Sequence, residues 1–224
     1  MTEPQRTQVR IKLYDVETEA DIERVRAGLQ RRDVWRNLDL LGPMDRPGKF
    51  RGQFLTGYLR AHLILDADTD EEYGFFLLRC GRLKSAGRVE VDIAIPNPSI
   101  RGRGISQVAL LELFDRWLLG DLCAELWAWI DLGNSSSVQM VRSLNIPVVN
   151  QTRRGISVDG TVDVIELRLR KEEWLRLRPS VLEKLGLLVA KSDEPASIGD
   201  PSVRRQDVSS LAASGHGGTL SDET

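Results

Sequence analysis

The segment from Ile95 to Ser106, IPNPSIRGRGIS, most strongly constrains how this chain can fold. A run rich in β-branched residues ends at Pro96, a short polar loop follows, and two glycines precede an apolar segment with helical spacing from Ile105 to about Leu119. This order predicts a strand, a glycine turn and a helix. Glycines let the backbone approach a ligand closely, and the first N–H groups of a helix lack internal partners and favour negative charge. We therefore expect this turn to bind a phosphorylated group.

Three phosphate-binding patterns compete for this segment. The P-loop pattern Gly-x-x-x-x-Gly-Lys-Ser/Thr is absent from the chain. A dinucleotide-binding fingerprint would need a glycine where Gln107 stands, and a place after the first strand of its unit. The third pattern, Arg-x-x-Gly-x-small, is satisfied by Arg101, Gly104 and Ser106. An ordinary strand–loop–helix connection with two glycines is the remaining alternative.

A second block lies downstream. Residues 127–131, WAWID, are typical of a strand, Asn134-Ser135-Ser136-Ser137 follows, and residues 138–144 have helical spacing. Asn and Ser are preferred helix N-caps, so this block alone indicates a capped short helix. In this order and at this separation, the two blocks resemble the GNAT superfamily of N-acetyltransferases, whose Arg-x-x-Gly-x-small loop binds the pyrophosphate of acetyl-CoA.

The two ends of the same region extend the resemblance to roughly residues 5–175. Residues 146–150 and the alternating strand pattern over 162–169 resemble the RimJ/RimL-like branch of the GNATs, as do a first strand near 9–13 and a helix near 20–29. The resemblance implies an α/β (mixed α+β) fold: a central mixed, mostly antiparallel twisted sheet flanked by helices on both faces.

The resemblance also implies acetyl-CoA as the acyl donor, without a metal, and a set of residues that bind it. Backbone N–H groups at the end of the strand before the loop would polarise the thioester carbonyl; these belong to Ile93, Ala94 and Ile95. The loop would hold the pyrophosphate through its amides, helped by the two arginine side chains; its residues are Arg101, Gly102, Arg103, Gly104, Ile105 and Ser106. Asn134 would meet the pantetheine amides.

Three residues are candidates for catalysis. Acetyl transfer needs a neutral amine, because the ammonium form has no lone pair with which to attack. Glu90 is our first candidate for the general base and Asp92 the second; they are two apart in a predicted strand, so both side chains project from one face. Mutual repulsion of two such carboxylates favours protonation of one, although a solvated strand face is the alternative. Ser137 is the candidate for stabilising the thiolate.

The family's usual tyrosine acid is missing. Val141 stands where many GNATs carry it, so water, Ser137, or one of Tyr14, Tyr58 and Tyr73 would have to serve. Trp127 and Trp129 face one side of a predicted strand, and could either pack in the core or border the acceptor pocket.

The resemblance predicts an acetyl-CoA-dependent N-acetyltransferase in which a primary amine attacks directly within a ternary complex. The branch acts on protein N-termini, amino acids and small amine metabolites, and nothing in the sequence selects among them. The alternative is a catalytically idle member that binds an acyl-CoA and works as an interaction or sensor module.

Composition restricts the partners and the location. The net charge of −2 gives no reason to expect direct nucleic-acid binding, and no run approaches the ~20 apolar residues of a membrane span. The N-terminus lacks an apolar signal core, and Cys80 and Cys123 fit buried, reduced thiols, so we expect a cytoplasmic protein. No cluster has metal-ligand spacing. The resemblance to the RimJ/RimL-like branch also implies a possible homodimer.

The remaining expectations concern chain organisation. We expect a second helical piece at 33–38, a loop over 42–57, and strands near 59–66 and 73–80 followed by one at 88–95. The acetyltransferase domain would span 1–176, followed by a short helix at 177–190. The Ser-, Gly- and Asp-rich segment 191–224 has too few large apolar residues to offset the entropy of ordering, so it is predicted to be disordered.

Overall fold

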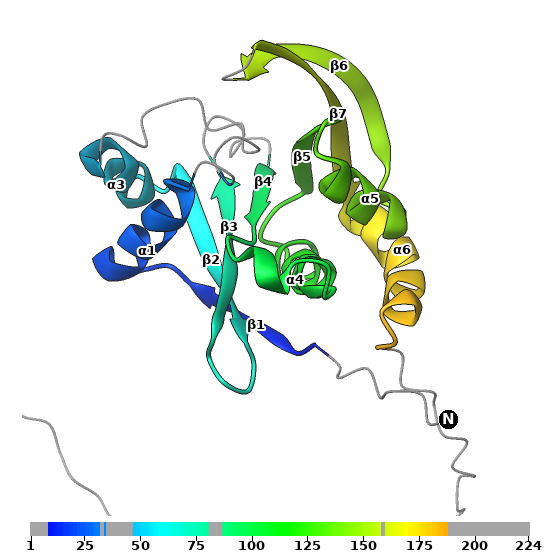
Figure 1. Cartoon of the computed structure of the whole chain (residues 1–224). Helices are drawn as coiled ribbons and strands as arrows, with labels where there is room; N and C mark the ends of the chain where they lie inside the picture. The colour runs from blue at the N-terminus through cyan, green and yellow to red at the C-terminus, as the bar shows by residue number, and fades with distance from the viewer. Residues whose placement is uncertain (1–8, 32–33, 35–46, 81–86, 158–159, 188–224) are drawn as a thin grey trace, which may run out of the picture. The chain divides into compact units, whose positions relative to one another are not determined.

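The computed structural model describes residues 9–31, 34, 47–80, 87–157 and 160–187. Within this part of the chain, seven strands form one sheet in the order β1-β2-β3-β4-β5-β7-β6 (Figure 1). The strands are β1 Ile11–Asp15, β2 Leu59–Asp66, β3 Glu72–Arg79, β4 Arg88–Ala94, β5 Glu125–Asp131, β6 Val148–Ser157 and β7 Gly160–Arg170. Only β4 and β5 run parallel; every other neighbouring pair is antiparallel. The expected mixed, mostly antiparallel sheet is confirmed.

Helices cover both faces of this sheet, as expected. On one face, α1 (Glu19–Leu29) and α3 (Pro47–Leu55) pack on β2 and β3, and their core includes Val25, Leu29, Phe50, Leu63 and Phe75. On the other face, α4 (Ile105–Phe114), α5 (Ser135–Ser143) and α6 (Lys171–Lys184) share a second core with strands β2 to β5 and β7. Figure 1 shows α1 and α3 on the opposite side of the sheet from α4. The sheet therefore separates two hydrophobic cores.

The helix predicted over residues 105–119 is present but changes its winding. α4 is α-helical to Phe114, and Asp115–Leu119 continue it as a π-helical turn. Asp115 accepts hydrogen bonds from Trp174 Nε1 (2.8 Å) and from Arg178 Nε and Nη2. These bonds tie α6 to the end of α4.

The prediction of a loop over residues 42–57 is wrong for residues 47–55, which form α3. Gly48 and Gly52 each disfavour a helix by about 1 kcal/mol, which is why the local composition is misleading. Phe50 and Phe54 lie one turn apart with ring centroids separated by 5.2 Å, and Phe50 is only 4% exposed. Burial of this aromatic pair outweighs the glycine penalty, an effect that depends on tertiary contacts.

The C-terminal helix begins earlier than expected. We expected it over 177–190, but α6 starts at Lys171, runs through Pro179 and ends at Lys184. The backbone N–H of Arg170 donates to the Glu173 carboxylate (2.9 Å), and Trp174 is 1% exposed. The buried tryptophan and this cap outweigh the proline that suggested a later start.

Some expectations lie outside the described residues. They are the helical piece at 33–38, apart from Val34, and the tail at 191–224. In the part that the structure does describe, no helix combines the length and apolar character that crossing a membrane requires.

Candidate active site

The central feature of the site is an interruption in the sheet between β4 and β5. These parallel strands pair over only three positions, from Arg88↔Glu125 to Glu90↔Trp127. On its other side, β4 stays paired with β3 as far as Phe75↔Ala94. The β5-facing backbone of β4 beyond Glu90 is therefore not used in the sheet, and a cleft of about 730 Å³ opens there.

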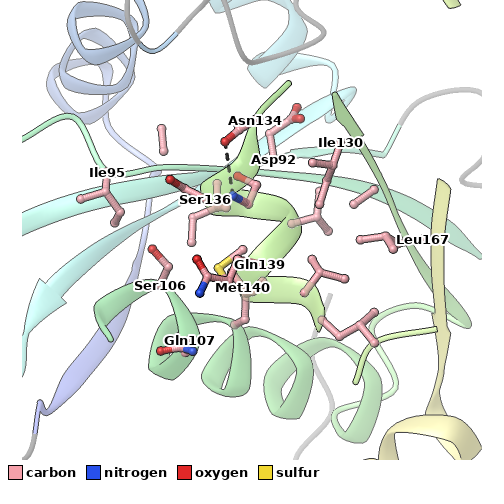
Figure 2. Close-up of a pocket in the computed structure, with 18 of the residues that line it drawn as sticks. Asp92, Ile95, Ser106, Gln107, Ile130, Asn134, Ser136, Gln139, Met140 and Leu167 are labelled. Atoms are coloured by element: carbon pink, nitrogen blue, oxygen red, sulfur yellow. Dashed lines mark hydrogen bonds between the residues drawn. The ribbon is translucent and has the colours of Figure 1, made fainter. Parts of the chain in front are cut away.

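The cleft is walled by both halves of the sheet and by two helices. Figure 2 shows Ile95 on one side, Ile130 and Leu167 on the other, and the α4 residues Ser106 and Gln107 near the α5 residues Gln139 and Met140. Gln107 Nε2 donates to Ser143 Oγ (3.0 Å), which donates to the Met140 carbonyl (2.6 Å). This chain of bonds joins α4 to α5. We missed Gln107 and Gln139 as lining residues; their only signal is a polar side chain within an otherwise apolar helical segment.

The glycine turn lies at the mouth of α4, as predicted. Gly102 and Gly104 have φ angles of +79° and +84°, a conformation that other residues adopt only with strain, and Gly104 is the N-cap of α4. A Cβ at Gly102 would meet no atom within 4 Å, so the turn faces open space. Of the predicted loop residues from 101 to 106, all but Arg103 line the cleft.

Arg101 has a bonding pattern that the sequence does not predict. Its Nε donates to the Ile95 carbonyl (2.9 Å) and its Nη2 to the Pro96 carbonyl (3.3 Å). The guanidinium therefore braces the loop against the end of β4. Ile93, Ala94 and Ile95, the predicted carbonyl-polarising residues, also line the cleft.

Asn134 and Ser137 sit on the far wall. Asn134 Oδ1 accepts a hydrogen bond from the Ser137 backbone N–H (3.3 Å), which makes Asn134 the N-cap of α5. The capped short helix is confirmed. Both residues line the cleft, and Figure 2 labels Asn134 there, although their contacts with a coenzyme stay a prediction.

The two candidate bases occupy different positions. Asp92 lines the cleft at 9% exposure, whereas Glu90 is not among the lining residues. Arg79 of β3 lies between them, with Nη1 2.7 Å from Glu90 Oε1 and Nη2 2.7 Å from Asp92 Oδ2. Both carboxylates therefore share one face, as predicted. The guanidinium offsets the repulsion that we expected between them.

No tyrosine takes the place of the missing acid in the part of the chain that is described. Val141 lines the cleft, but Tyr14, Tyr58 and Tyr73 do not. The Tyr73 hydroxyl donates to Asp66 Oδ2 (2.5 Å), and this bond raises the pKa of Tyr73 to about 12. Trp127 and Trp129 both line the cleft, and their place beside an acceptor stays a prediction.

Two other groups lie away from the cleft. His62 is buried, with Nδ1 2.6 Å from Asp15 Oδ1 and Nε2 accepting from Trp117 Nε1 (2.8 Å). Cys80 and Cys123 are buried thiols, and burial raises the pKa of Cys123 to about 12. Across the described ranges, no three His, Cys, Asp or Glu side chains are grouped so that they could hold a metal ion.

The sheet order, the interrupted β4–β5 pairing and the helices on both faces define the GNAT acetyltransferase fold. Among similar solved structures is spermidine N-acetyltransferase from Vibrio cholerae in complex with CoA and spermine, with a TM-score of 0.61 and 14% identity over 74% of this chain and 98% of that chain. A dodecameric structure of the Vibrio cholerae enzyme in an intermediate state gives a TM-score of 0.61 at 14% identity, over 74% of this chain and 96% of that one. A third, in complex with manganese ions, gives 0.59 at 13% identity, over 76% and 97%. No family model and no curated protein matches the sequence.

Proposed function

We propose that this chain is an N-acetyltransferase that transfers the acetyl group of acetyl-CoA to a primary amine within a ternary complex. The observation that carries the proposal is the coincidence, at one cleft, of unpaired β4 backbone and a glycine turn that opens α4. An extended, amide-rich molecule with a diphosphate at one end fits both features. The similarity to solved N-acetyltransferases, one of them in complex with CoA, supports the same conclusion.

In this proposal, one end of the cleft binds the diphosphate and the other binds the thioester. The N–H groups around Gly104 and Ile105, together with the positive end of the α4 dipole, would hold the diphosphate. Backbone N–H groups among Ile93, Ala94 and Ile95 would donate to the thioester carbonyl as its oxygen gains negative charge. Acetyl-CoA supplies the acyl group and the thiolate leaving group.

The reaction also involves two proton transfers, one from the amine and one to the sulfur. The amine nitrogen forms a bond to the acetyl carbon, the carbon–sulfur bond breaks, and the amine loses a proton while the sulfur gains one or is stabilised as thiolate. Asp92 is now the better candidate for receiving the amine proton, because it lines the cleft and Glu90 does not. Ser137 stays our candidate for stabilising the sulfur.

We do not favour the alternative of an idle acyl-CoA-binding module, because the similar solved structures named above are N-acetyltransferases. Four expectations stay predictions: the assignment to the RimJ/RimL-like branch, the domain boundaries, the cytoplasmic location and a homodimer. The spermidine N-acetyltransferase forms a dodecamer, so assemblies larger than a dimer are compatible with this fold.

Calorimetry followed by a turnover assay tests the proposal. The full-length chain should bind acetyl-CoA with a stoichiometry of one per chain, and CoA release should depend on an added primary amine. Failure to bind acetyl-CoA would exclude the transferase. Binding without CoA release from any member of a panel of amino acids, peptides and polyamines would favour the idle module instead.

A further inference from the structure

Arg168 is a charged residue of the cleft lining whose charge is not balanced by a described neighbour. In the described part of the chain, the charged lining residues are Asp92, Arg101 and Arg168. Asp92 is paired with Arg79, and Arg101 donates to two backbone carbonyls. Arg168 has no ion pair or hydrogen bond with any described residue, and its Nε is buried without an acceptor.

The neighbours of Arg168 do not supply a carboxylate. It lies opposite Trp127 in the β5–β7 pairing, and its guanidinium carbon is 6.0 Å from the centroid of that ring. The nearby Glu125 is already engaged, by Arg170 (2.5 Å), by Arg88 (3.0 Å) and by Trp127 Nε1 (3.0 Å). Glu166, two residues away on the same face of β7, makes no ion pair with Arg168.

A partly buried guanidinium with an unused Nε–H is a costly arrangement unless a ligand completes it. The planar fork of arginine matches the two oxygens of a carboxylate, and the adjacent indole helps to hold the fork in place. An anion bound here would therefore gain a charge-assisted hydrogen bond at a site that is already formed.

The coenzyme's own phosphates do not account for this arginine. Trp127 faces Glu90 at the last paired position of β4 and β5, the closed end of the cleft. The glycine turn follows the opposite end of β4, and the five residues from Glu90 to Ala94 alone span about 13 Å. The diphosphate and Arg168 thus belong to opposite ends of the cleft. The end at Arg168 is the one left for the acceptor amine to bind.

We propose that the acceptor is an amine that also carries a carboxylate, which Arg168 binds beside Trp127. This inference rests on the proposed transferase function and narrows it. The positive charge of Arg168 also disfavours a polycationic acceptor, and Asp92, the acidic lining residue among those described, is already engaged in an ion pair with Arg79. The acceptor preference is thus predicted to differ from the spermidine acetylation for which the structural neighbours are named.

Matched acceptor pairs test this inference on the full-length chain. CoA release is measured with amino acids, with the corresponding amino-acid amides and with spermidine. The carboxylate member of the preferred pair should exceed its amide by at least about tenfold in kcat/KM, and spermidine should be a poorer acceptor than either. Preference for the amides or for spermidine, or no turnover of any carboxylate acceptor, would overturn the inference.

Three variants separate a binding role of Arg168 from a structural one. Arg168→Gln should raise the KM of carboxylate acceptors by about tenfold or more, while amide acceptors change by less than about threefold. Arg168→Lys should fall between Arg168→Gln and the parent, because it keeps the charge but not the fork. Arg88→Gln is the matched control: Arg88 also lies over the Trp127 ring, at 5.2 Å, but is paired with Glu125 and does not line the cleft, so acceptor preference should not change.

Calorimetry with acetyl-CoA keeps the two proposals distinct. Unchanged coenzyme affinity in Arg168→Gln, together with selective loss of carboxylate acceptors, supports both. Normal coenzyme binding with equal loss for carboxylates and amides refutes the role of Arg168 but leaves the transferase intact. Absence of coenzyme binding in the parent protein refutes the transferase itself.

Discussion

Asp92 and Glu90 are only two residues apart on β4, yet only one of the two carboxylates borders the cleft. Both project from the same face of β4 and both contact Arg79 at 2.7 Å. Glu90 is still at the paired end of β4, opposite Trp127, whereas Asp92 lies beyond the last pair with β5 and borders the cleft. Of these two carboxylates, only Asp92 borders the cleft, which is why we propose it as the group that receives the proton of a bound amine.

Asp92→Asn should lower kcat by about 100-fold, the typical contribution of a general base, with little change in acetyl-CoA affinity. Glu90→Gln is the matched control and should lower kcat by less than about threefold. Each variant keeps one carboxylate on Arg79, so urea unfolding should give similar stabilities for both. A larger kcat loss in Glu90→Gln would restore our original order of candidates.

His62 shows that a buried histidine can influence stability without belonging to the site. Burial and the nearby Arg116 guanidinium lower the pKa of His62 to about 4, against the opposing influence of Asp15. In the unfolded chain the same imidazole titrates near its ordinary value of about 6.5. The native state therefore resists protonation, so its stability is complete above the unfolded pKa and is lost as pH falls toward 4.

Between about pH 7 and about pH 5, this linkage should lower the free energy of unfolding by about 2 kcal/mol. Urea denaturation at the two pH values measures it. His62→Gln should be less stable at neutral pH, because Trp117 and Asp15 lose their partner, but it should lack most of the pH-dependent loss. An equally steep decline in the variant would assign the effect to carboxylates.

At the scale of elements, the glycine turn and α4 act as one unit. Gly104 is at once the last residue of the turn and the N-cap of the helix, it has a left-handed φ, and it lines the cleft together with Ile105, the first helical residue. Gly186, which follows α6, has a comparable φ of +68° but lies outside the cleft lining. These two glycines share a left-handed φ, but only Gly104 lies at the cleft.

Gly104→Ala and Gly186→Ala should each cost about 1–2 kcal/mol in the free energy of unfolding, because alanine is strained at positive φ. Only Gly104→Ala should also weaken acetyl-CoA binding, by about tenfold or more, since its methyl group would lie at the helix N-terminus, 3.6 Å from Gln107 Oε1, and crowd the amides that bind the diphosphate. Urea unfolding and calorimetry separate the two effects. Unaltered affinity in Gly104→Ala would remove the turn from the binding site.

At the scale of the whole molecule, the cleft is a discontinuity in an otherwise continuous sheet. The strands β1 to β4 and the strands β5 to β7 are joined by only three paired positions between β4 and β5. A ligand that bridges the two sets of strands should therefore stabilise the molecule as a whole.

Acetyl-CoA at about 100 times its dissociation constant should add about 2.7 kcal/mol to the free energy of unfolding, which corresponds to about 5–10 °C in Tm. Thermal denaturation in its presence and absence measures this shift. Pantetheine at the same concentration lacks the diphosphate and should give a much smaller shift. Equal shifts would show that the glycine turn contributes nothing to binding.

Local patterns predicted most of the elements. The alternation over residues 162–169 in β7, the Asn134 cap and the glycine turn could all be recognised, because each depends on residues close together in the chain. α3 and the start of α6 could not, because Phe50 and Trp174 stabilise helices through contacts with distant elements that override Gly52 and Pro179.

In the candidate site, too, some features could be predicted from the sequence and others could not. Short-range chemistry in the amino-acid order was enough to indicate a phosphate-binding turn and the carboxylates of β4. Tertiary structure alone decided that Asp92 borders the cleft and Glu90 does not, and that Arg79 forms an ion pair with each. It also decided that the buried Nε of Arg168, beside Trp127, finds no acceptor among the described residues. The physical reason is that ion pairing and burial depend on which strands become neighbours, and residues 79, 92, 127 and 168 meet only once the sheet has formed.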